Sequence, residues 1–185
     1  MGRDKIIWTI VVLVVLPFAI AGLMNARDKG DVLKDPIEIV KPLVRHFEGL
    51  SLEAYHDEGR LAIGYGHDLP AGTKIEDVAP ISEEQAERLL DRDLAVAAYY
   101  VDRYVGSAGL DEHQKAALID FVYNLGPGKF SMSTLRHVIV SGDLHGAPDE
   151  IRRWKYAGGE QSTDLEARRE AEVRLWNGKP WNGSS

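Results

Sequence analysis

The chain has 185 residues, of which 44% are hydrophobic, enough for one globular domain with a buried core and a short additional element. It contains no cysteine, which excludes disulfide bonds, thiolate metal ligands, cysteine nucleophiles and control by thiol oxidation. The formal net charge of −7 argues against a nucleic-acid partner. Residues 151–185 are nevertheless basic, and we expect these charges on a solvated helix face, with contact to an anionic polymer as the alternative.

The N-terminal segment is strongly apolar, because residues 6–24 (IIWTIVVLVVLPFAIAGLM) carry no charge. As a helix this segment would measure about 28 Å, enough to cross the hydrocarbon core of a bilayer. Arg3 and Lys5 precede it, so the positive-inside rule places the rest of the chain outside the cytoplasm. Two interpretations remain open: an uncleaved membrane anchor, which we prefer because the apolar run is long, and a signal peptide cut at the Ala-Ile-Ala sequence of residues 19–21. Both require the secretion machinery.

One domain is predicted over residues 35–178, after an N-terminal segment at 1–26 and a linker at 27–34, and before a tail at 179–185. Its secondary structure is predicted to be mostly helical, with two short strands around a turn. A small β-hairpin lobe, a long linking helix and a helical C-terminal lobe would then form an α+β fold with a cleft between the lobes. The predicted helices cover residues 35–48, 82–101, 111–125, 134–141, 147–156 and 164–176, and the strands cover residues 52–55 and 60–65.

Two acidic side chains lie where the predicted lobes meet. Glu48 occupies the last turn of the first helix beside Phe47, where the negative end of the helix dipole and an apolar neighbour favour a protonated carboxyl. Asp57 lies at a strand end, where a polar setting favours the carboxylate, although an Asp before a turn is also ordinary turn chemistry. One protonated and one ionised carboxyl facing a cleft are the minimum for acid–base cleavage of a glycosidic bond.

His67 follows the sequence Gly64-Tyr65-Gly66, which lacks the third glycine and the helix of a dinucleotide-binding fingerprint. No second His, Asp or Glu lies at metal-ligand spacing from His67, so we expect a structural histidine, no metal and no cofactor. The chain also has tryptophans that we expect in the core or in a lid rather than as sugar platforms, namely Trp154, Trp176 and Trp181.

Taken in order, several segments resemble one family. The motif EGL…AYHD…IGYGH at residues 48–67 is similar to the active-site segment of phage lysozymes of the T-even type, glycoside hydrolase family 24. The resemblance extends over residues 36–178. Its further pieces are AERLL…DL at 86–94, FVYNLG at 121–126, F…STL at 130–135, RRW…AGG at 152–159 and RREAE at 168–172.

The resemblance implies a two-lobe lysozyme-like fold and a monomeric endolysin with muramidase activity. Such an enzyme cuts the β-1,4 bond between N-acetylmuramic acid and N-acetylglucosamine in peptidoglycan and so lyses the host cell. Glu48 would be the general acid. Asp57 would stabilise charge in the transition state and help to place the attacking water, as in an inverting glycosidase.

The same resemblance implies roles for four further residues. His67 would form an ion pair with Asp93, which agrees with a structural histidine. Tyr123 and Thr134 would lie near the sugar-binding cleft. The enzyme is expected at the host inner membrane facing the periplasm, or in the periplasm after cleavage or release.

An uncleaved, releasable N-terminal helix is similar to the signal-arrest-release arrangement of some phage endolysins. Segments of that type tend to be weakly hydrophobic and rich in glycine and alanine. Here only Gly22, Ala19 and Ala21 have that character, which favours tighter anchoring or simple cleavage.

The sequence departs from the family at one position of the active-site segment. The family usually has a threonine directly before the Ile-Gly-x-Gly-His run, and here that position is Ala62 after a turn about one residue shorter. Another group, with Glu58 and Tyr65 as neighbours, must then hold the water, or the rate falls by about tenfold to a thousandfold, or the mechanism differs. A membrane-tethered wall-binding protein with weak catalysis and a lytic transglycosylase are therefore the alternative functions.

Overall fold

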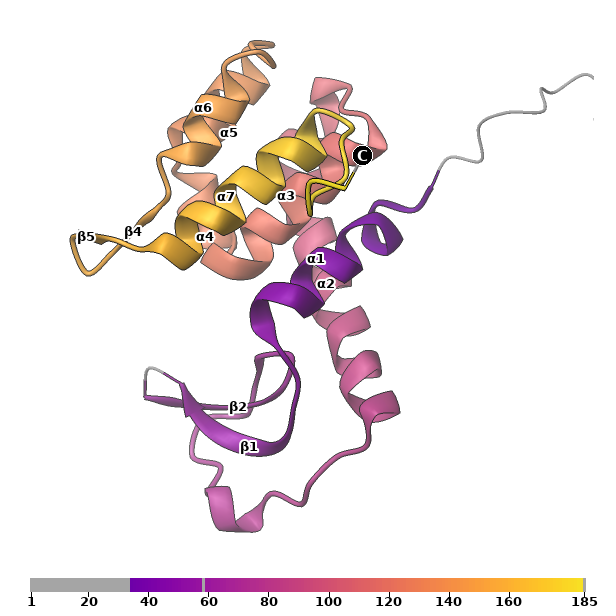
Figure 1. Ribbon diagram of the computed structural model, residues 1–185, viewed down its shortest axis with the longest axis vertical. Helices are drawn as coiled ribbons and strands as arrows, with labels where there is room; N and C mark the ends of the chain where they lie inside the picture. Colours follow the sequence, from indigo (N-terminus) through magenta and orange to yellow (C-terminus); the bar gives the residue numbers. More distant parts are fainter. Residues whose placement is uncertain (1–33, 58, 185) are drawn as a thin grey trace, which may run out of the picture. The chain divides into compact units, whose positions relative to one another are not determined.

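The computed structural model describes residues 34–57 and 59–184. The N-terminal segment at 1–26, most of the linker and Glu58 lie outside the described residues. Among the helices of the described part, none is long and apolar enough to cross a membrane. The domain that follows is built as predicted, with a small antiparallel sheet and a larger helical part (Figure 1).

The smaller lobe is a sheet with the strand order β1-β2-β3. β1 (Ser51–Asp57) pairs with β2 (Arg60–Gly64), which pairs with β3 (His67–Asp68), both antiparallel. The register sets Tyr55 of β1 directly opposite Ala62 of β2. β3 was not predicted, because a strand of two residues is too short to show an alternating pattern. A loop with the short 3₁₀ helix η1 (Ile75–Asp77) leads from the sheet to the long linking helix α2 (Glu83–Val105).

Helix ends are fixed by the side chains that the sequence pattern indicates. α1 (Pro36–Glu48) begins where Oδ1 of Asp35 accepts a hydrogen bond of 2.9 Å from the Ile37 amide. α2 (Glu83–Val105) and α3 (Glu112–Leu125) each begin with a complete capping box. The helical lobe continues with η2 (Gly106–Ala108), α4 (Pro127–Ser131), α5 (Thr134–Val140), α6 (Ala147–Arg152), the hairpin β4 (Tyr156–Ala157) and β5 (Glu160–Gln161), and α7 (Thr163–Trp176).

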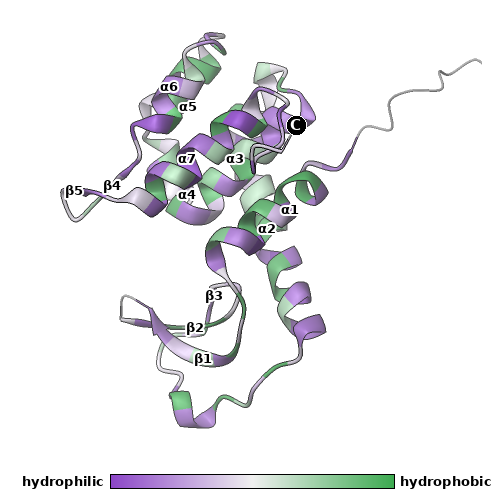
Figure 2. Cartoon of the chain, viewed as in Figure 1, coloured by the Kyte–Doolittle hydropathy of each residue, from purple (hydrophilic) through white to green (hydrophobic). Residues whose placement is uncertain are grey.

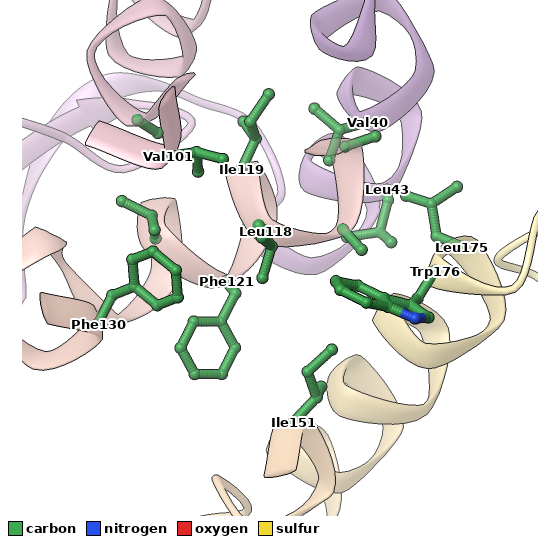
Figure 3. Close-up of a cluster of buried hydrophobic side chains, with 14 of the residues drawn as sticks. Val40, Leu43, Val101, Leu118, Ile119, Phe121, Phe130, Ile151, Leu175 and Trp176 are labelled. Atoms are coloured by element: carbon green, nitrogen blue, oxygen red, sulfur yellow. The ribbon is translucent and has the colours of Figure 1, made fainter. Parts of the chain in front are cut away.

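The hydrophobic core is centred on α3, which packs against α1, α2 and α7. Hydrophobic and hydrophilic residues alternate along the helices in Figure 2, as expected for helices that bury one face. Phe121 of α3 is fully buried, and its ring meets Trp154 edge-on at 5.6 Å. Leu43 of α1 lies near Trp176 of α7 in the same cluster (Figure 3). Trp176 is buried and Trp154 and Trp181 are partly buried against the core, so the tryptophans are packing residues, as predicted.

Two predictions about the helical lobe were wrong. The predicted helix at 147–156 ends at Arg152 and gives way to the β4–β5 hairpin. The charges of α7 do not all lie on a solvated face, since Arg168, Arg169 and Glu172 are buried.

Candidate active site

Glu48 is the last residue of α1, as predicted, and Gly49 follows it with a φ of 68°. The Glu48 side chain is 22% exposed, so its carboxyl can be reached from solvent. Its Oε1 accepts a hydrogen bond of 2.6 Å from Nη1 of Arg168 in α7. The first and last α-helices of the domain therefore meet at this carboxyl.

Arg168 is held in place by Asp120 of α3. Nε and Nη2 of Arg168 donate to the two oxygens of Asp120 at 2.9 and 2.7 Å, and both side chains are buried. The guanidinium also lies over the Phe47 ring, 5.6 Å from its centroid. Burial alone would raise the pKa of Asp120, but the charge and hydrogen bonds of Arg168 lower it. A two-point contact of this kind fixes the guanidinium plane and so aims Nη1 at Glu48.

A second buried charge pair lies one residue further along α7. Nη2 of Arg169 is 2.8 Å from Oε1 of Glu172 and donates to Oδ1 of Asn124 at 2.9 Å. Burial raises the pKa of Glu172 well above its usual range, and Arg169 offsets this only in part. The interior behind Glu48 therefore holds the pair of Arg168 and Asp120 and, beside it, a buried carboxyl with a raised pKa in contact with Arg169.

Asp57 is the last residue of β1 and is exposed, as the sequence predicts for an ionised carboxylate. Within residues 34–57 and 59–184 its side chain makes no hydrogen bond or ion pair, so it is available to a water molecule or a substrate. Tyr55 lies two residues earlier and therefore projects from the same face of the sheet. Burial, then the charge of Asp57, then the charge of Glu48 raise the pKa of Tyr55. Tyr55 thus lies in the field of both carboxylates.

A cavity of about 350 Å³ is lined in part by Gly66, the glycine that also faces Glu48, whereas Glu48 and Asp57 are not among its lining residues. A methyl group placed on Gly66 would lie 3.5 Å from Oε2 of Glu48 and 4.0 Å from the Tyr55 hydroxyl, so only glycine leaves this space free. Among the residues lining the cavity are Gly66, His67, Asp93, Tyr100, Tyr123 and Pro127.

The structure brings three of the four remaining candidates to this cavity. Nδ1 of His67 lies 2.8 Å from Oδ2 of Asp93, the contact that the resemblance implies. The Tyr123 hydroxyl donates to the Tyr65 carbonyl at 2.6 Å, and burial raises its pKa, so it stays a donor. Thr134 is the exposed first residue of α5 and is not part of the cavity lining.

Tyr65, one of the groups considered in place of the missing threonine, is engaged elsewhere. Its hydroxyl donates to Oε1 of Glu87 at 3.0 Å, and the same oxygen accepts from Nε of Arg45 at 2.9 Å. This contact ties the turn before β3 to α1 and α2. Ala62 itself is fully buried, so its methyl group is covered by neighbouring side chains.

Sequence reasoning missed three residues around Glu48: Tyr55, Asp120 and Arg168. Asp120 had a detectable signal, because it interrupts the apolar run of the most hydrophobic long helix, where a lone carboxylate needs a buried partner. Arg168 had no signal except the resemblance of its segment RREAE at 168–172, since an arginine in a polar helix is exposed in most proteins. In the described part of the chain, no cluster of three or more His, Cys, Asp or Glu side chains could hold a metal ion.

With this geometry in view, the model of the phage lysozyme family matches residues 45–172, a range that includes Glu48, Asp57, Asp120 and Arg168. The chain belongs to the phage lysozyme family. It is therefore a glycoside hydrolase.

Relatives and solved structures agree with this assignment. The SAR-endolysin of Bacteriophage PS119 is 40% identical to this phage lysozyme over 132 residues, which are 70% of this chain and 77% of the relative. The muramidase domain of SpmX from Asticaccaulis excentricus superposes with a TM-score of 0.65 at 28% identity, covering 76% of this chain and 93% of that domain. An endolysin from Escherichia coli O157:H7 phage FAHEc1 gives a TM-score of 0.64 at 25% identity, covering 80% and 94%. The predicted α+β lysozyme-like fold is confirmed.

Proposed function

We propose that this phage lysozyme is an endolysin that hydrolyses the β-1,4 bond between N-acetylmuramic acid and N-acetylglucosamine in peptidoglycan. The observation that carries the proposal is a partly exposed carboxyl at the end of α1, held by a buried arginine and faced by Gly66, which also lines a cavity. A second, unpaired carboxylate ends the neighbouring strand β1. Names of the relatives, which are endolysins and a muramidase domain, support the same substrate.

The two carboxyl groups take different roles in this reaction. Glu48 donates its proton to the glycosidic oxygen as the bond from that oxygen to the anomeric carbon breaks. Asp57 stabilises the positive charge that develops on the sugar, helps to place the water that attacks the anomeric carbon, and accepts the proton that this water loses. Arg168 then pairs with the carboxylate that Glu48 has become. His67 and Asp93 keep a structural role, and Tyr123 and Thr134 are proposed to border the bound glycan.

We also propose that residues 6–24 anchor the enzyme in the host inner membrane, with the catalytic domain in the periplasm. The uncharged run of this segment supports the anchor, and so do the SAR-endolysin names of the relatives from Bacteriophage PS119 and Escherichia phage Mu. The enzyme acts there as a monomer, or free in the periplasm if the segment is cleaved or released.

The central test compares the full-length chain, purified in a mild detergent, with Glu48→Gln on isolated peptidoglycan. Wild type should release reducing ends and clear outer-membrane-permeabilised Gram-negative cells. Glu48→Gln should lose at least a thousandfold in rate, because the amide cannot supply the proton. Glu53→Gln is the matched control, since Glu53 is an exposed carboxylate of the same strand as Asp57, and it should stay within twofold.

Product analysis separates hydrolysis from the two alternative functions. A lytic transglycosylase would yield anhydro-muramyl ends and would tolerate Asp57→Asn, whereas a hydrolase yields reducing ends and should lose rate in Asp57→Asn. The wall-binding alternative is favoured by one observation, the burial of Ala62 where the family has a threonine. Binding to peptidoglycan without any release of reducing ends would establish that alternative and reject the enzyme proposal.

A further inference from the structure

The position of the missing threonine is covered by a specific neighbour. Ala62 is fully buried, and the residue directly opposite it on β1 is Tyr55. Directly opposed residues of an antiparallel pair project from the same face of the sheet, with Cβ atoms about 4.5–5.5 Å apart. The Tyr55 ring and the Ala62 methyl group therefore share one face, and Asp57 projects from it too.

The Tyr55 hydroxyl reaches towards the proposed proton donor. One point in space, where a methyl group on Gly66 would stand, is 4.0 Å from this hydroxyl and 3.5 Å from Oε2 of Glu48. That point is open because glycine has no side chain. The φ of 88° at position 66 also favours glycine there. Within the described residues the Tyr55 hydroxyl has no hydrogen-bond partner in the protein.

Its surroundings keep Tyr55 in the donor form. Burial and the charges of Asp57 and Glu48 all raise its pKa, so the hydroxyl retains its proton throughout the neutral range. Tyr65, which the sequence offered as a replacement, is held by Glu87. Of the two tyrosines, only Tyr55 has a hydroxyl without a hydrogen-bond partner among the described residues. It also lies on the face of the sheet that carries Ala62 and Asp57.

We propose that the Tyr55 hydroxyl takes over the task of the absent threonine and donates a hydrogen bond to the attacking water, with Asp57 as the acceptor for that water. This proposal rests on the proposed hydrolysis. A hydroxyl on the longer tyrosine side chain reaches the water from β1, whereas the threonine of the family would reach it from β2. Tyr55 belongs to the AYHD segment that the chain shares with the family, and the small Ala62 opposite it leaves room for the ring.

Tyr55→Phe tests the proposal, because it removes the hydroxyl and keeps the ring. We expect kcat on purified peptidoglycan strands to fall at least tenfold with KM within twofold, while far-UV circular dichroism and Tm stay at wild-type values. Tyr156→Phe on the β4–β5 hairpin, an exposed tyrosine far along the chain, is the matched control and should change neither constant.

A rescue experiment distinguishes catalysis from packing. Ala62→Ser in the Tyr55→Phe background returns a hydroxyl to the sheet face and should recover at least part of kcat, and Ala62→Thr is tested beside it. Wild-type kcat in Tyr55→Phe, or a loss that falls on KM or that neither serine nor threonine reverses, would overturn the proposal. If wild type itself releases no reducing ends, the proposed hydrolysis fails first, which is a separate result.

Discussion

Arg168 joins two carboxyl groups, Asp120 behind it and Glu48 in front of it. A buried guanidinium is costly to desolvate, and the two hydrogen bonds that Arg168 donates to Asp120 offset that cost before any contact with Glu48 is made. Glu48 can therefore gain or lose its proton without leaving an unpaired charge in the core. The stability of the Asp120–Arg168 pair therefore does not depend on the protonation state of Glu48.

Removal of Asp120 should show the contribution of this pair to stability. Asp120→Ala leaves the Arg168 charge buried without its main partner, so we expect a loss of about 3–5 kcal/mol in the free energy of unfolding, measured with urea. Asp120→Asn keeps an acceptor and should cost about 1–3 kcal/mol. Asp102→Ala removes an exposed carboxylate that pairs loosely with Lys115, at 3.6 Å, and should cost less than about 1 kcal/mol. Equal losses in Asp120→Ala and Asp102→Ala would contradict the role assigned to Asp120.

Glu172 gives the protein a pH dependence of opposite sign to that of a paired carboxylate. Its pKa is raised in the folded state, so above the pKa of the unfolded chain, near 4.5, the folded state holds one proton more than the unfolded state. Folding stability must then fall as pH rises from about 4.5 towards the folded-state pKa. Glu172→Gln replaces the titratable carboxyl by an amide. The free energy of unfolding should then fall less steeply with rising pH, and Tm at pH 7 should be higher than in the wild type. Urea titrations from pH 4 to 8 give the slope, and an unchanged slope in Glu172→Gln would show that Glu172 is ionised when folded.

Among the elements, the turn between β2 and β3 should be the most sensitive to substitution. Gly66 has a left-handed φ of 88° and faces Glu48 and Tyr55, so Gly66→Ala adds a methyl group to the active site and strains the backbone by about 1–2 kcal/mol. Gly72→Ala is the matched control, since Gly72 has a φ of 86° and open space around it. Both variants should lose similar stability by thermal unfolding. Only Gly66→Ala should lose most of its activity on peptidoglycan, and similar activities would argue against this position for Glu48.

The C-terminal segment after α7 packs back onto α1. His46 of α1 lies two residues before Glu48, and its ring centroid is 5.0 Å from that of Trp181. Trp181 also packs against the core. We expect Trp181→Ala to lower the free energy of unfolding by about 2–3 kcal/mol, because the side chain is half-buried. Removal of residues 179–185, predicted to be a tail, should cost at least as much. A truncated chain with wild-type Tm would show that the segment is indeed a dispensable tail.

The sequence predicts those elements that have their causes nearby in the chain. The caps at Asp35, Ser82 and Asp111 and the apolar stripes behind them are local, so α1, α2 and α3 were predicted to within one to four residues. The position of Glu48 at a helix end and of Asp57 at a strand end followed from the same signals. The two-residue strands did not, because hydrogen bonds to a neighbouring strand alone define them. The Asp120–Arg168 pair joins residues 48 positions apart, and no local pattern encodes such a contact.

For the whole molecule, the proposed anchor makes a prediction about where the chain is found. An uncleaved segment at 6–24 should keep the full-length chain in the membrane fraction after a carbonate wash, with a mass that includes residues 1–26. Deletion of residues 6–24 should leave the domain in the cytoplasm, where it cannot reach peptidoglycan and the cells survive. Cell fractionation with mass spectrometry checks both outcomes. A soluble periplasmic product whose first residue follows Ala21 would establish the signal-peptide interpretation instead.

The contact between Glu48 and Arg168 can form only late in the synthesis of the chain. The two residues are 120 positions apart, with the proposed proton donor at the end of the first helix and its partner in the last one. Proteins are synthesised from the N-terminus, so Glu48 leaves the ribosome long before α7 exists. The carboxyl of Glu48 acquires its partner only when nearly the whole chain has been made and α7 has docked. A chain that ends before residue 163 lacks α7 and therefore lacks this contact.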